Sequence, residues 1–288
     1  MKVLIFGAGG QVGRALQALA PADAIITAID NDVLDLTDEA AIVPFIRDTA
    51  PDLIINASGY TAVDKAETER DLAYAINAEA PAKMAQAAAE IGARFMHIST
   101  DFVFDGKTYL PYAPDAATNA LSVYGASKAA GEAAVVAAGG NALTVRTAWV
   151  YSAGAANFVE TMLKLMASRD HINVVADQIG TPTHADSLAR ALWALAATDA
   201  RGIVHFTDAG IASWYDFAVA IYDLGTAAGV LDSAVSIMPI PSSAYPTPAA
   251  RPHYSVLDKS ATWNMLGYTA DHWRHELAAM MMKKRNAE

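Results

Sequence analysis

A tyrosine and a lysine stand four residues apart in Tyr124-Gly-Ala-Ser-Lys128, and a hydroxyl pair, Ser99-Thr100, precedes them in the chain. Residues four apart share a face of a helix, so we expect the Lys128 ammonium to lie beside the Tyr124 phenol. A positive charge there would lower the pKa of the phenol from its usual value of about 10. Tyr124 could then move a proton while Thr100 polarises a carbonyl oxygen. A lone Tyr-x-x-x-Lys is common by chance, so the prediction depends on what accompanies it.

A glycine-rich turn near the amino terminus accompanies this pair, in Gly7-Ala-Gly-Gly10-Gln-Val-Gly13. It follows an apolar run and precedes a helical pattern, which is the context of a dinucleotide-binding turn. Glycines allow a pyrophosphate to approach the backbone N–H groups at the positive end of the helix. A plain glycine turn is the alternative. We predict that this turn holds a nicotinamide dinucleotide through Gly7, Gly10, Gln11, Val12 and Gly13.

An acidic residue, Asp30, ends the second expected strand, where a carboxylate can accept a hydrogen bond from the ribose 2′-hydroxyl. Its charge would repel a 2′-phosphate, and no Arg or Lys follows it immediately. The sequence therefore favours NADH over NADPH, unless a basic side chain reaches in from elsewhere. Asp35 and Leu36 are expected near the adenine, with Thr37 as the cap of the following helix. The turn after the third strand is expected to line the same pocket through Ala57, Ser58, Gly59, Tyr60 and Thr61.

Short apolar runs alternate with Ala-rich helical stretches through the first half of the chain. The expected strands are 3–6, 25–30, 53–57, 95–99 and 143–146, and the expected helices are 11–20, 38–49, 70–91 and 122–138. Uniformly apolar strands indicate a parallel sheet that is buried on both faces. Strict alternation makes the sheet doubly wound, with its ligand at the carboxyl ends of the strands. The sequence thus predicts an α/β fold with a Rossmann-type doubly wound parallel sheet.

The rhythm loosens after Tyr151, which suggests a second, smaller α/β domain at the carboxy terminus. We expect a dinucleotide-binding domain over 1–151, joined by part of 184–210, and a substrate domain over 152–288. Residues 202–207 read as a strand that returns to the parent sheet or starts a small one. The Pro-rich stretch 239–252 cannot form regular helix. Further helices are expected near 157–168, 186–197, 258–266 and 270–284, with a strand at 172–175.

Composition limits the classes of function. The 288 residues carry a net charge of −11, which disfavours a nucleic-acid-binding surface. The absence of cysteine excludes disulfides and thiolate chemistry and fits a cytoplasmic protein, and the scattered histidines suggest no metal site. No run approaches the roughly 20 apolar residues of a membrane span. The first apolar run passes directly into glycines, so we expect no signal peptide.

Ordered blocks along nearly the whole chain resemble the extended short-chain dehydrogenases, and within them the dTDP-4-dehydrorhamnose reductases. The most specific blocks are Gly10-Gln-Val-Gly13, Tyr60-Thr-Ala-Val-Asp-Lys-Ala-Glu67, Ser99-Thr-Asp-Phe-Val-Phe-Asp105, Val123-Tyr-Gly-Ala-Ser-Lys128, Arg146-Thr-Ala-Trp-Val-Tyr151, Asp177-Gln-Ile-Gly-Thr-Pro-Thr183 and Tyr245-Pro-Thr-Pro-Ala-Ala-Arg-Pro252. The resemblance implies that NAD(P)H reduces the C4 ketone of dTDP-4-dehydro-L-rhamnose to dTDP-L-rhamnose.

The same resemblance implies roles for individual residues. Thr100, Tyr124 and Lys128 match the catalytic threonine, tyrosine and lysine, and Lys128 can also bond the nicotinamide ribose. Trp149 matches a tryptophan that contacts the sugar nucleotide. Asp101 is expected to orient a sugar hydroxyl, and Asn157 is a further candidate for the substrate. Arg251 is the candidate for the diphosphate, because a guanidinium fork suits phosphate oxygens.

The chain departs from the family pattern at Ala15, where members that dimerise around a metal carry an acidic residue. We therefore expect no metal-bridged dimer, although a homodimer of another kind stays possible. Two other functions stay open at this point. One is reduction of a different dTDP-4-keto-6-deoxyhexose, and the other is a non-catalytic dinucleotide-binding subunit that regulates a partner enzyme.

Overall fold

The structure is a computed structural model that describes residues 1–286. Its centre is a six-stranded sheet with the order β10-β5-β4-β3-β1-β2, in which all neighbouring strands are parallel. The strands are β1 (Lys2–Phe6), β2 (Ile25–Ile29), β3 (Leu53–Asn56), β4 (Arg94–Thr100), β5 (Asn141–Thr147) and β10 (Gly202–His205). The predicted α/β fold with a parallel, Rossmann-like sheet is confirmed, and the strand at 202–205 does return to the parent sheet.

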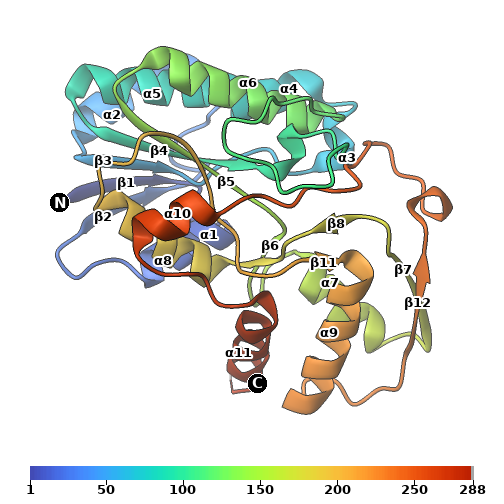
Figure 1. The fold of residues 1–288 in the computed structure, drawn as a ribbon. Coiled ribbons are helices and arrows are strands. Elements are labelled where there is room, and N and C mark those ends of the chain that lie inside the picture. Colours follow the sequence, from blue (N-terminus) through green and yellow to red (C-terminus); the bar gives the residue numbers. More distant parts are fainter. Residues whose placement is uncertain (287–288) are drawn as a thin grey trace.

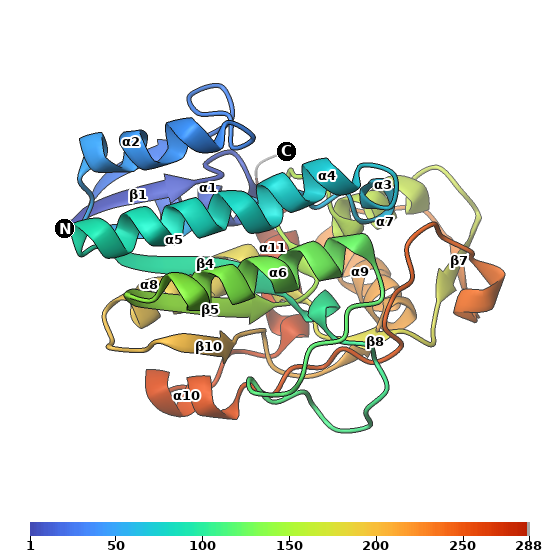
Figure 2. The same ribbon diagram turned by 90° about the horizontal axis from the view of Figure 1, so that it is seen from above.

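Helices cover both faces of this sheet (Figure 1 and Figure 2). Successive side chains of a strand point to opposite faces. Leu4 and Phe6 of β1 accordingly pack into one apolar cluster, and Val3 and Ile5 pack into another. The first cluster lies under α2 (Glu39–Thr49) and α5 (Ala80–Ile91), beside which α6 (Val123–Ala138) runs, and the second lies under α1 (Gln11–Ala18) and α8 (Ala185–Ala196).

The order of the strands reverses at β1, because β2 lies on one side of it and β3 on the other. Connections on the two sides leave the sheet in opposite directions, so the carboxyl ends of β1 and β3 border a crevice that ligands of such sheets occupy. The glycine turn follows β1 and residues 57–61 follow β3. The glycine turn and residues 57–61, which the sequence predicts for one pocket, therefore lie together at this crevice.

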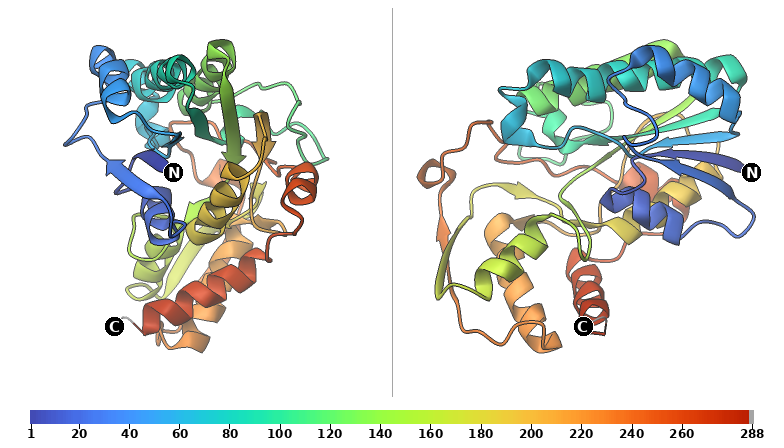
Figure 3. Two further views of the ribbon diagram at one scale, coloured as in Figure 1. Left: turned by 90° about the vertical axis from the view of Figure 1, so that its left-hand side faces the viewer. Right: turned by 180° about the vertical axis from the view of Figure 1, so that it is seen from behind.

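Most residues beyond β5 form a lobe at the carboxyl side of the sheet (Figure 1 and Figure 3). Its apolar cluster includes Phe217 and Leu277, both fully buried. The elements around this cluster are α7 (Phe158–Met166), β7 (His171–Val175), α9 (Trp214–Ala228), β12 (Ser236–Ile240) and α11 (Trp273–Arg285). No helix among residues 1–286 has both the length and the apolar character needed to cross a bilayer.

Short elements complete the chain and mark where the sequence-based expectations need correction. They are α3 (Val63–Ala66), α4 (Arg70–Tyr74), a π-helical turn η1 (Ala75–Glu79), the 3₁₀ turns η2 (Asp101–Val103) and η3 (Ser242–Ala244), β6 (Val150–Tyr151), β8 (Ile179–Gly180), β9 (Thr183–His184), β11 (Ala212–Ser213) and α10 (Ser260–Leu266). The helix expected over 70–91 is thus interrupted by η1.

The sequence reasoning did not foresee α9 or β12. Helix α9 begins with a capping box in which Ser213 and Asp216 each bond the backbone N–H of the other, a signal that the sequence does carry. Thr37 is not the cap of α2, because that helix begins after Asp38, whose side chain accepts from the Ala40 backbone N–H. The Pro-rich stretch contains no α-helix, and Pro239 lies within β12, which pairs with β7.

Candidate active site

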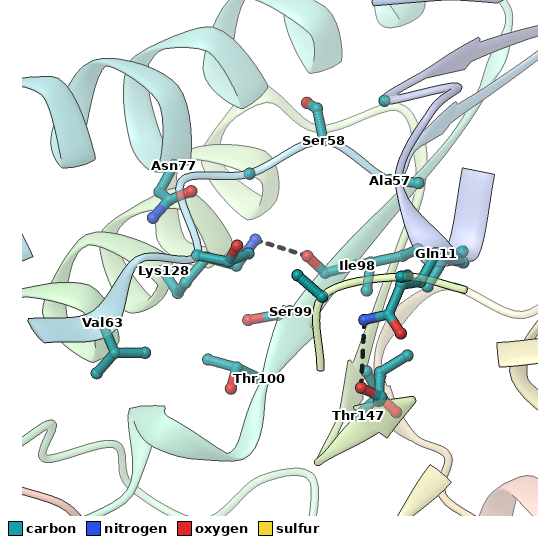
Figure 4. A pocket seen from close by; sticks show the side chains of 18 of the residues that line it. Gln11, Ala57, Ser58, Val63, Asn77, Ile98, Ser99, Thr100, Lys128 and Thr147 are labelled. Atoms are coloured by element: carbon teal, nitrogen blue, oxygen red, sulfur yellow. Dashed lines mark hydrogen bonds between the residues drawn. The ribbon is translucent and has the colours of Figure 1, made fainter. Parts of the chain in front are cut away.

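The carboxyl ends of β1, β3, β4 and β5 border one open cleft with a volume of about 1140 Å³. Fifteen of the predicted residues line it: Gly7, Gly10, Gln11, Val12, Asp30, Ala57, Ser58, Gly59, Thr61, Thr100, Asp101, Tyr124, Lys128, Trp149 and Arg251. Five lie outside the lining, and these are Gly13, Asp35, Leu36, Tyr60 and Asn157. Figure 4 shows one part of the cleft, in which side chains from β4, α6 and the glycine turn face one another.

The glycine turn has the geometry that a pyrophosphate needs. Gly7 has a φ of +81°, which favours glycine, and a Cβ there would lie 2.7 Å from the Ser58 nitrogen. A Cβ at Gly13 would overlap the Gly7 carbonyl oxygen, so Gly13 serves the close contact between turn and helix. Within residues 1–286, no side chain caps the start of α1 at Gly10. The first N–H groups of α1 are thus available to an anion, and the turn fits a dinucleotide.

Asp30 lies directly against this turn, and its Oδ2 accepts a hydrogen bond from the Gly9 backbone N–H at 2.5 Å. Arg14 on α1 lines the cleft on the same side and donates to the Gly9 carbonyl oxygen at 2.5 Å. The sequence reasoning considered basic residues just after Asp30 and missed Arg14. Arg14 lies in the first turn of the helix that follows the glycine turn, and this position in the sequence could have indicated a basic residue at the cleft.

Asp35 and Leu36 follow β2 and lie outside the lining of the main cleft. Asp35 accepts hydrogen bonds from the backbone and hydroxyl of Thr37, at 2.9 and 2.7 Å, and these bonds lower the pKa of its carboxyl. Leu36 is buried in the apolar cluster that includes Ile42 and Ile46. Leu36 also lines a small hollow next to the cleft together with Gly7 and Asp30, and its contact with an adenine stays a prediction.

The turn after β3 is held by two buried asparagines. Asn56 accepts from the backbone N–H and the hydroxyl of Ser58, at 3.0 and 2.5 Å. Asn77 clamps Tyr60 by accepting from its N–H at 2.8 Å and donating to its carbonyl oxygen at 3.0 Å. The Tyr60 phenol donates to Glu69 at 2.6 Å, and this bond raises its pKa to about 12. The backbone of Tyr60 thus shapes the turn while its ring lies outside the lining.

Asn77 itself lines the cleft, although the sequence reasoning did not select it. It lies in the π-helical turn η1, where the widened backbone accommodates the close approach of α6. At Gly131 of α6 a Cβ would overlap the Asn77 carbonyl oxygen. Single π-helical turns inside α-helices are frequent at functional sites. No local pattern in the sequence marks this turn.

Thr100, Asp101 and Tyr124 come together at the end of β4. The Thr100 hydroxyl donates to Asp101 Oδ1 at 3.1 Å and lies beside the phenol of Tyr124, whose ring packs edge-on against Phe102. Burial raises the pKa of Asp101 to about 6 and the pKa of Tyr124 to about 12. The Tyr124 phenol therefore keeps its proton at neutral pH.

The Lys128 amino group contacts residues of β4. It donates to the Ile98 carbonyl oxygen at 2.6 Å (Figure 4). The same amino group lies 3.3 Å from Nε2 of His97. Burial lowers the pKa of Lys128 to about 8, and the causes that set the Tyr124 pKa do not include Lys128. The expected lowering of the phenol pKa is wrong for this structure, because desolvation dominates at both side chains.

Two tryptophans, Trp149 and Trp214, form one part of the wall of the cleft. Trp149 has a φ of +48°, and its indole stacks on that of Trp214 with centroids 3.5 Å apart. Both rings line the cleft. Trp214 is the first residue of α9, a helix that the sequence reasoning missed, and so this partner was missed with it.

Arg251 and Asn157 have partners that the sequence did not reveal. The Arg251 guanidinium forms a two-pronged ion pair with Asp64, with contacts of 3.1 and 2.8 Å, and still lines the cleft. Asn157 caps α7 by accepting from Glu160 N–H and donates to the Gln11 amide oxygen at 2.9 Å. Asn157 therefore joins the lobe to the start of α1 behind the lining.

Ala15, the position that departs from the family pattern, is buried in the apolar cluster beneath α8. Among residues 1–286, no three His, Cys, Asp or Glu side chains gather in an arrangement that could hold a metal ion.

Comparisons with known proteins extend this description. The family model described as the RmlD substrate binding domain matches residues 1–286. A dTDP-4-dehydrorhamnose reductase of Burkholderia thailandensis is 41% identical over 286 residues, covering 96% of each chain. The crystal structure of a dTDP-4-dehydrorhamnose reductase from Clostridium acetobutylicum superposes with a TM-score of 0.92 and 39% identity, covering 98% of each chain.

A further solved structure is the dTDP-4-dehydrorhamnose reductase of Bacillus anthracis in complex with NADP. It has a TM-score of 0.92 and 35% identity, and the match covers 98% of this chain and 99% of that one. The agreement runs through the glycine turn, the cleft and the lobe alike, since almost no part of either chain is left unmatched. This chain belongs to the RmlD family, the family of the dTDP-4-dehydrorhamnose reductases.

Proposed function

We propose that this chain is an NAD(P)H-dependent reductase that converts the C4 ketone of dTDP-4-dehydro-L-rhamnose into the alcohol of dTDP-L-rhamnose. The observation that carries the proposal is the contact between Thr100 and Tyr124 at the end of β4, in the same cleft as the glycine turn. A dinucleotide site and a proton donor share one space, which is what reduction of a carbonyl requires. The names of the similar proteins support the choice of sugar nucleotide.

The reduced nicotinamide supplies the hydride when it is bound. Tyr124 donates its phenolic proton to the carbonyl oxygen, a contribution on the order of 10²–10⁴ in rate. Thr100 hydrogen-bonds the same oxygen and holds it where charge develops. Lys128, bonded to the Ile98 carbonyl, faces the cleft between the strand end and Ser58, where a ribose hydroxyl would lie. The Trp149 and Trp214 rings offer an apolar face to the sugar nucleotide.

For the diphosphate we propose Arg251. Asp64 fixes its guanidinium at the border of the cleft, which leaves less rotamer freedom to lose on binding. For the cofactor we propose that the charge of Asp30 favours NADH. Arg14 opposes this preference, because its guanidinium lies at the same turn and can bind a 2′-phosphate. In this scheme residues 1–151 with part of 184–210 hold the cofactor, and residues 152–288 supply most of the substrate site.

The test is oxidation of NADH or NADPH with dTDP-4-dehydro-L-rhamnose made freshly by the preceding epimerase. Turnover that yields dTDP-L-rhamnose supports the proposal. Faster turnover of a C3 or C5 epimer would replace the substrate by another dTDP-4-keto-6-deoxyhexose. Tight binding of NADH without turnover of any such sugar would overturn the enzymatic function in favour of a regulatory subunit.

A further inference from the structure

Behind the cleft lies a chain of three buried polar residues, Asn56, His97 and Lys128. Asn56 ends β3 and His97 is its partner on β4, while Lys128 reaches them from α6. Their exposures are 0%, 0% and 4%. Asn56 Nδ2 lies 3.1 Å from His97 Nδ1, and His97 Nε2 lies 3.3 Å from Lys128 Nζ. Each contact must join a donor to an acceptor, because an unmatched polar group at this depth is costly.

The orientation of the Asn56 amide is set by Ser58. The Ser58 backbone N–H can only donate, and it lies 3.0 Å from Asn56 Oδ1. The amide oxygen must therefore face Ser58, which leaves the NH₂ group facing His97. Since that NH₂ can only donate, Nδ1 of His97 must accept.

The tautomer of His97 follows from this contact. Burial, the larger cause, holds the pKa of His97 well below its usual range, so the ring is neutral whichever form Lys128 takes. A neutral imidazole that accepts at Nδ1 carries its proton at Nε2. That N–H points at Lys128 Nζ. An ammonium there would set donor against donor, whereas a neutral amine has a lone pair to accept the bond.

We propose that His97 is a positioning residue that, fixed by Asn56 as the Nε2–H tautomer, donates to Lys128 and favours its neutral amine over the ammonium. The amine in turn donates to the Ile98 carbonyl oxygen. The lowered pKa of Lys128 agrees with this arrangement.

The arrangement links Lys128 to the cofactor side of the cleft. When Lys128 gains a proton from solvent, the imidazole proton must change from Nε2 to Nδ1 so that Nε2 can accept. The Asn56 amide must then turn over, and the Ser58 N–H loses its acceptor. Ser58 lines the cleft, so a ligand that bonds Ser58 shifts the protonation of Lys128. Any effect of this coupling on catalysis rests on the proposed function. The hydrogen-bond pattern itself is independent of that function.

Other charges around Lys128 are few. Tyr124 and Glu132 lie one turn away on α6, and the Glu132 carboxylate raises the pKa of Lys128. That carboxylate is held by Arg146 of β5 in a two-pronged pair at 2.8 and 2.7 Å, which offsets much of its charge. His97 is the titratable group on β4 that contacts the amine. None of the other groups dictates which nitrogen of His97 carries the proton.

The first experiment uses the unaltered protein. Long-range proton–nitrogen NMR spectra of ¹⁵N-histidine-labelled protein distinguish the two neutral tautomers, and a His97→Leu sample identifies the His97 signals. We expect a protonated Nε2 and an unprotonated Nδ1 in the absence of ligand at pH 9.5, which is above the pKa of about 8 of Lys128 and leaves its amine neutral. A protonated Nδ1, or an imidazolium, would overturn the proposal whatever the protein's activity.

The second experiment changes the tautomer through Asn56→Asp, whose carboxylate can accept from both Ser58 and a protonated Nδ1. Titration of ¹³C-labelled lysine, with Lys128→Arg to identify the signal, measures the pKa of Lys128. We expect this pKa to rise by about one unit or more, which is a tenfold gain in proton affinity. In a His97→Leu background the same substitution should produce less than half of that shift in pH units, because only its charge then acts. Equal shifts in both backgrounds would contradict the role of His97.

Near-ultraviolet circular dichroism tests whether each variant is folded. If a variant is unfolded, the tautomer measurement on the unaltered protein still tests the role of His97. The outcome is independent of the reductase assay. A protein without turnover can still show the Nε2–H tautomer, and an active reductase can lack it.

Discussion

The indole rings of Trp149 and Trp214 lie parallel, with centroids 3.5 Å apart and planes inclined by 7°. Trp149 follows strand β5 of the six-stranded sheet and Trp214 begins α9, so the pair joins the end of the sheet to the carboxy-terminal lobe. Gly180 lies against this pair, because a Cβ there would be 2.6 Å from Cε2 of Trp149. The stacked position of the Trp149 ring therefore requires a glycine at residue 180.

Gly180→Ala should displace the Trp149 ring and weaken binding of the dTDP-sugar. Overpacking costs about 1–3 kcal/mol, so we expect KM to rise about fivefold or more. The Kd for NADH, measured by fluorescence, should change little because a Cβ at Gly180 would meet Trp149 and not the glycine turn. Gly92→Ala is the control, since it strains a positive φ in open space at the end of α5. An equal rise in KM in both variants would attribute the effect to lost stability alone.

Tyr124→Phe removes the proton donor and keeps the ring that packs against Phe102. We expect kcat to fall by roughly 10²–10⁴, with NADH binding retained, because a positioned general acid contributes about that much. Steady-state kinetics and a binding titration on one preparation check both parts. Turnover within tenfold of the unaltered chain would remove Tyr124 from the mechanism.

Asp101→Asn should stabilise the protein in a pH-dependent way. Burial raises the pKa of Asp101 from 3.8 to about 6, so between these values the native state holds a proton that the unfolded state has lost. Stability therefore falls as pH rises through this window, by up to about 3 kcal/mol. Asparagine keeps the size and removes the charge, so the gain in unfolding free energy should be near zero at pH 4 and largest above pH 6.

Denaturant titrations of the two proteins across that range measure this gain directly. A constant difference at every pH would show that the Asp101 carboxyl does not titrate in the native state as its burial implies. We expect the same substitution to lower turnover, because Asp101 borders Thr100 and Tyr124 at the site of proton donation.

Asp30 and Arg14 should act in opposite directions on the choice of cofactor. Asp30→Ser removes the charge beside Gly9, so we expect NADH to bind about tenfold more weakly and the ratio of NADPH to NADH affinity to rise. Arg14→Gln should weaken NADPH by about tenfold and leave NADH nearly unchanged. Calorimetric Kd values for both cofactors decide. If Arg14→Gln weakened NADH binding as much as NADPH binding, Arg14 would not select between the two cofactors.

Much of the scaffold could be predicted because its signals are local. Val3–Phe6 and Leu53–Asn56 are apolar runs of strand length, and Gly7 and Gly13 mark the turn that only residues without a Cβ permit. The helix over 70–91 was predicted as a single element because the π-helical turn at Ala75–Glu79 leaves the composition unchanged. It arises where α6 crosses close by, and one chain segment does not reveal its neighbour.

The sequence by itself determined the parallel sheet, the glycine turn and the presence of Thr100 and Tyr124 at one edge, because strand periodicity and the carboxyl-end rule need no knowledge of distant contacts. Only the tertiary structure decided that Arg251 meets Asp64, that Trp214 covers Trp149, and that Lys128 faces His97 instead of Tyr124. These pairings join segments far apart in the chain. Burial then sets their protonation, because desolvation depends on everything packed around a group and not on its own position in the sequence.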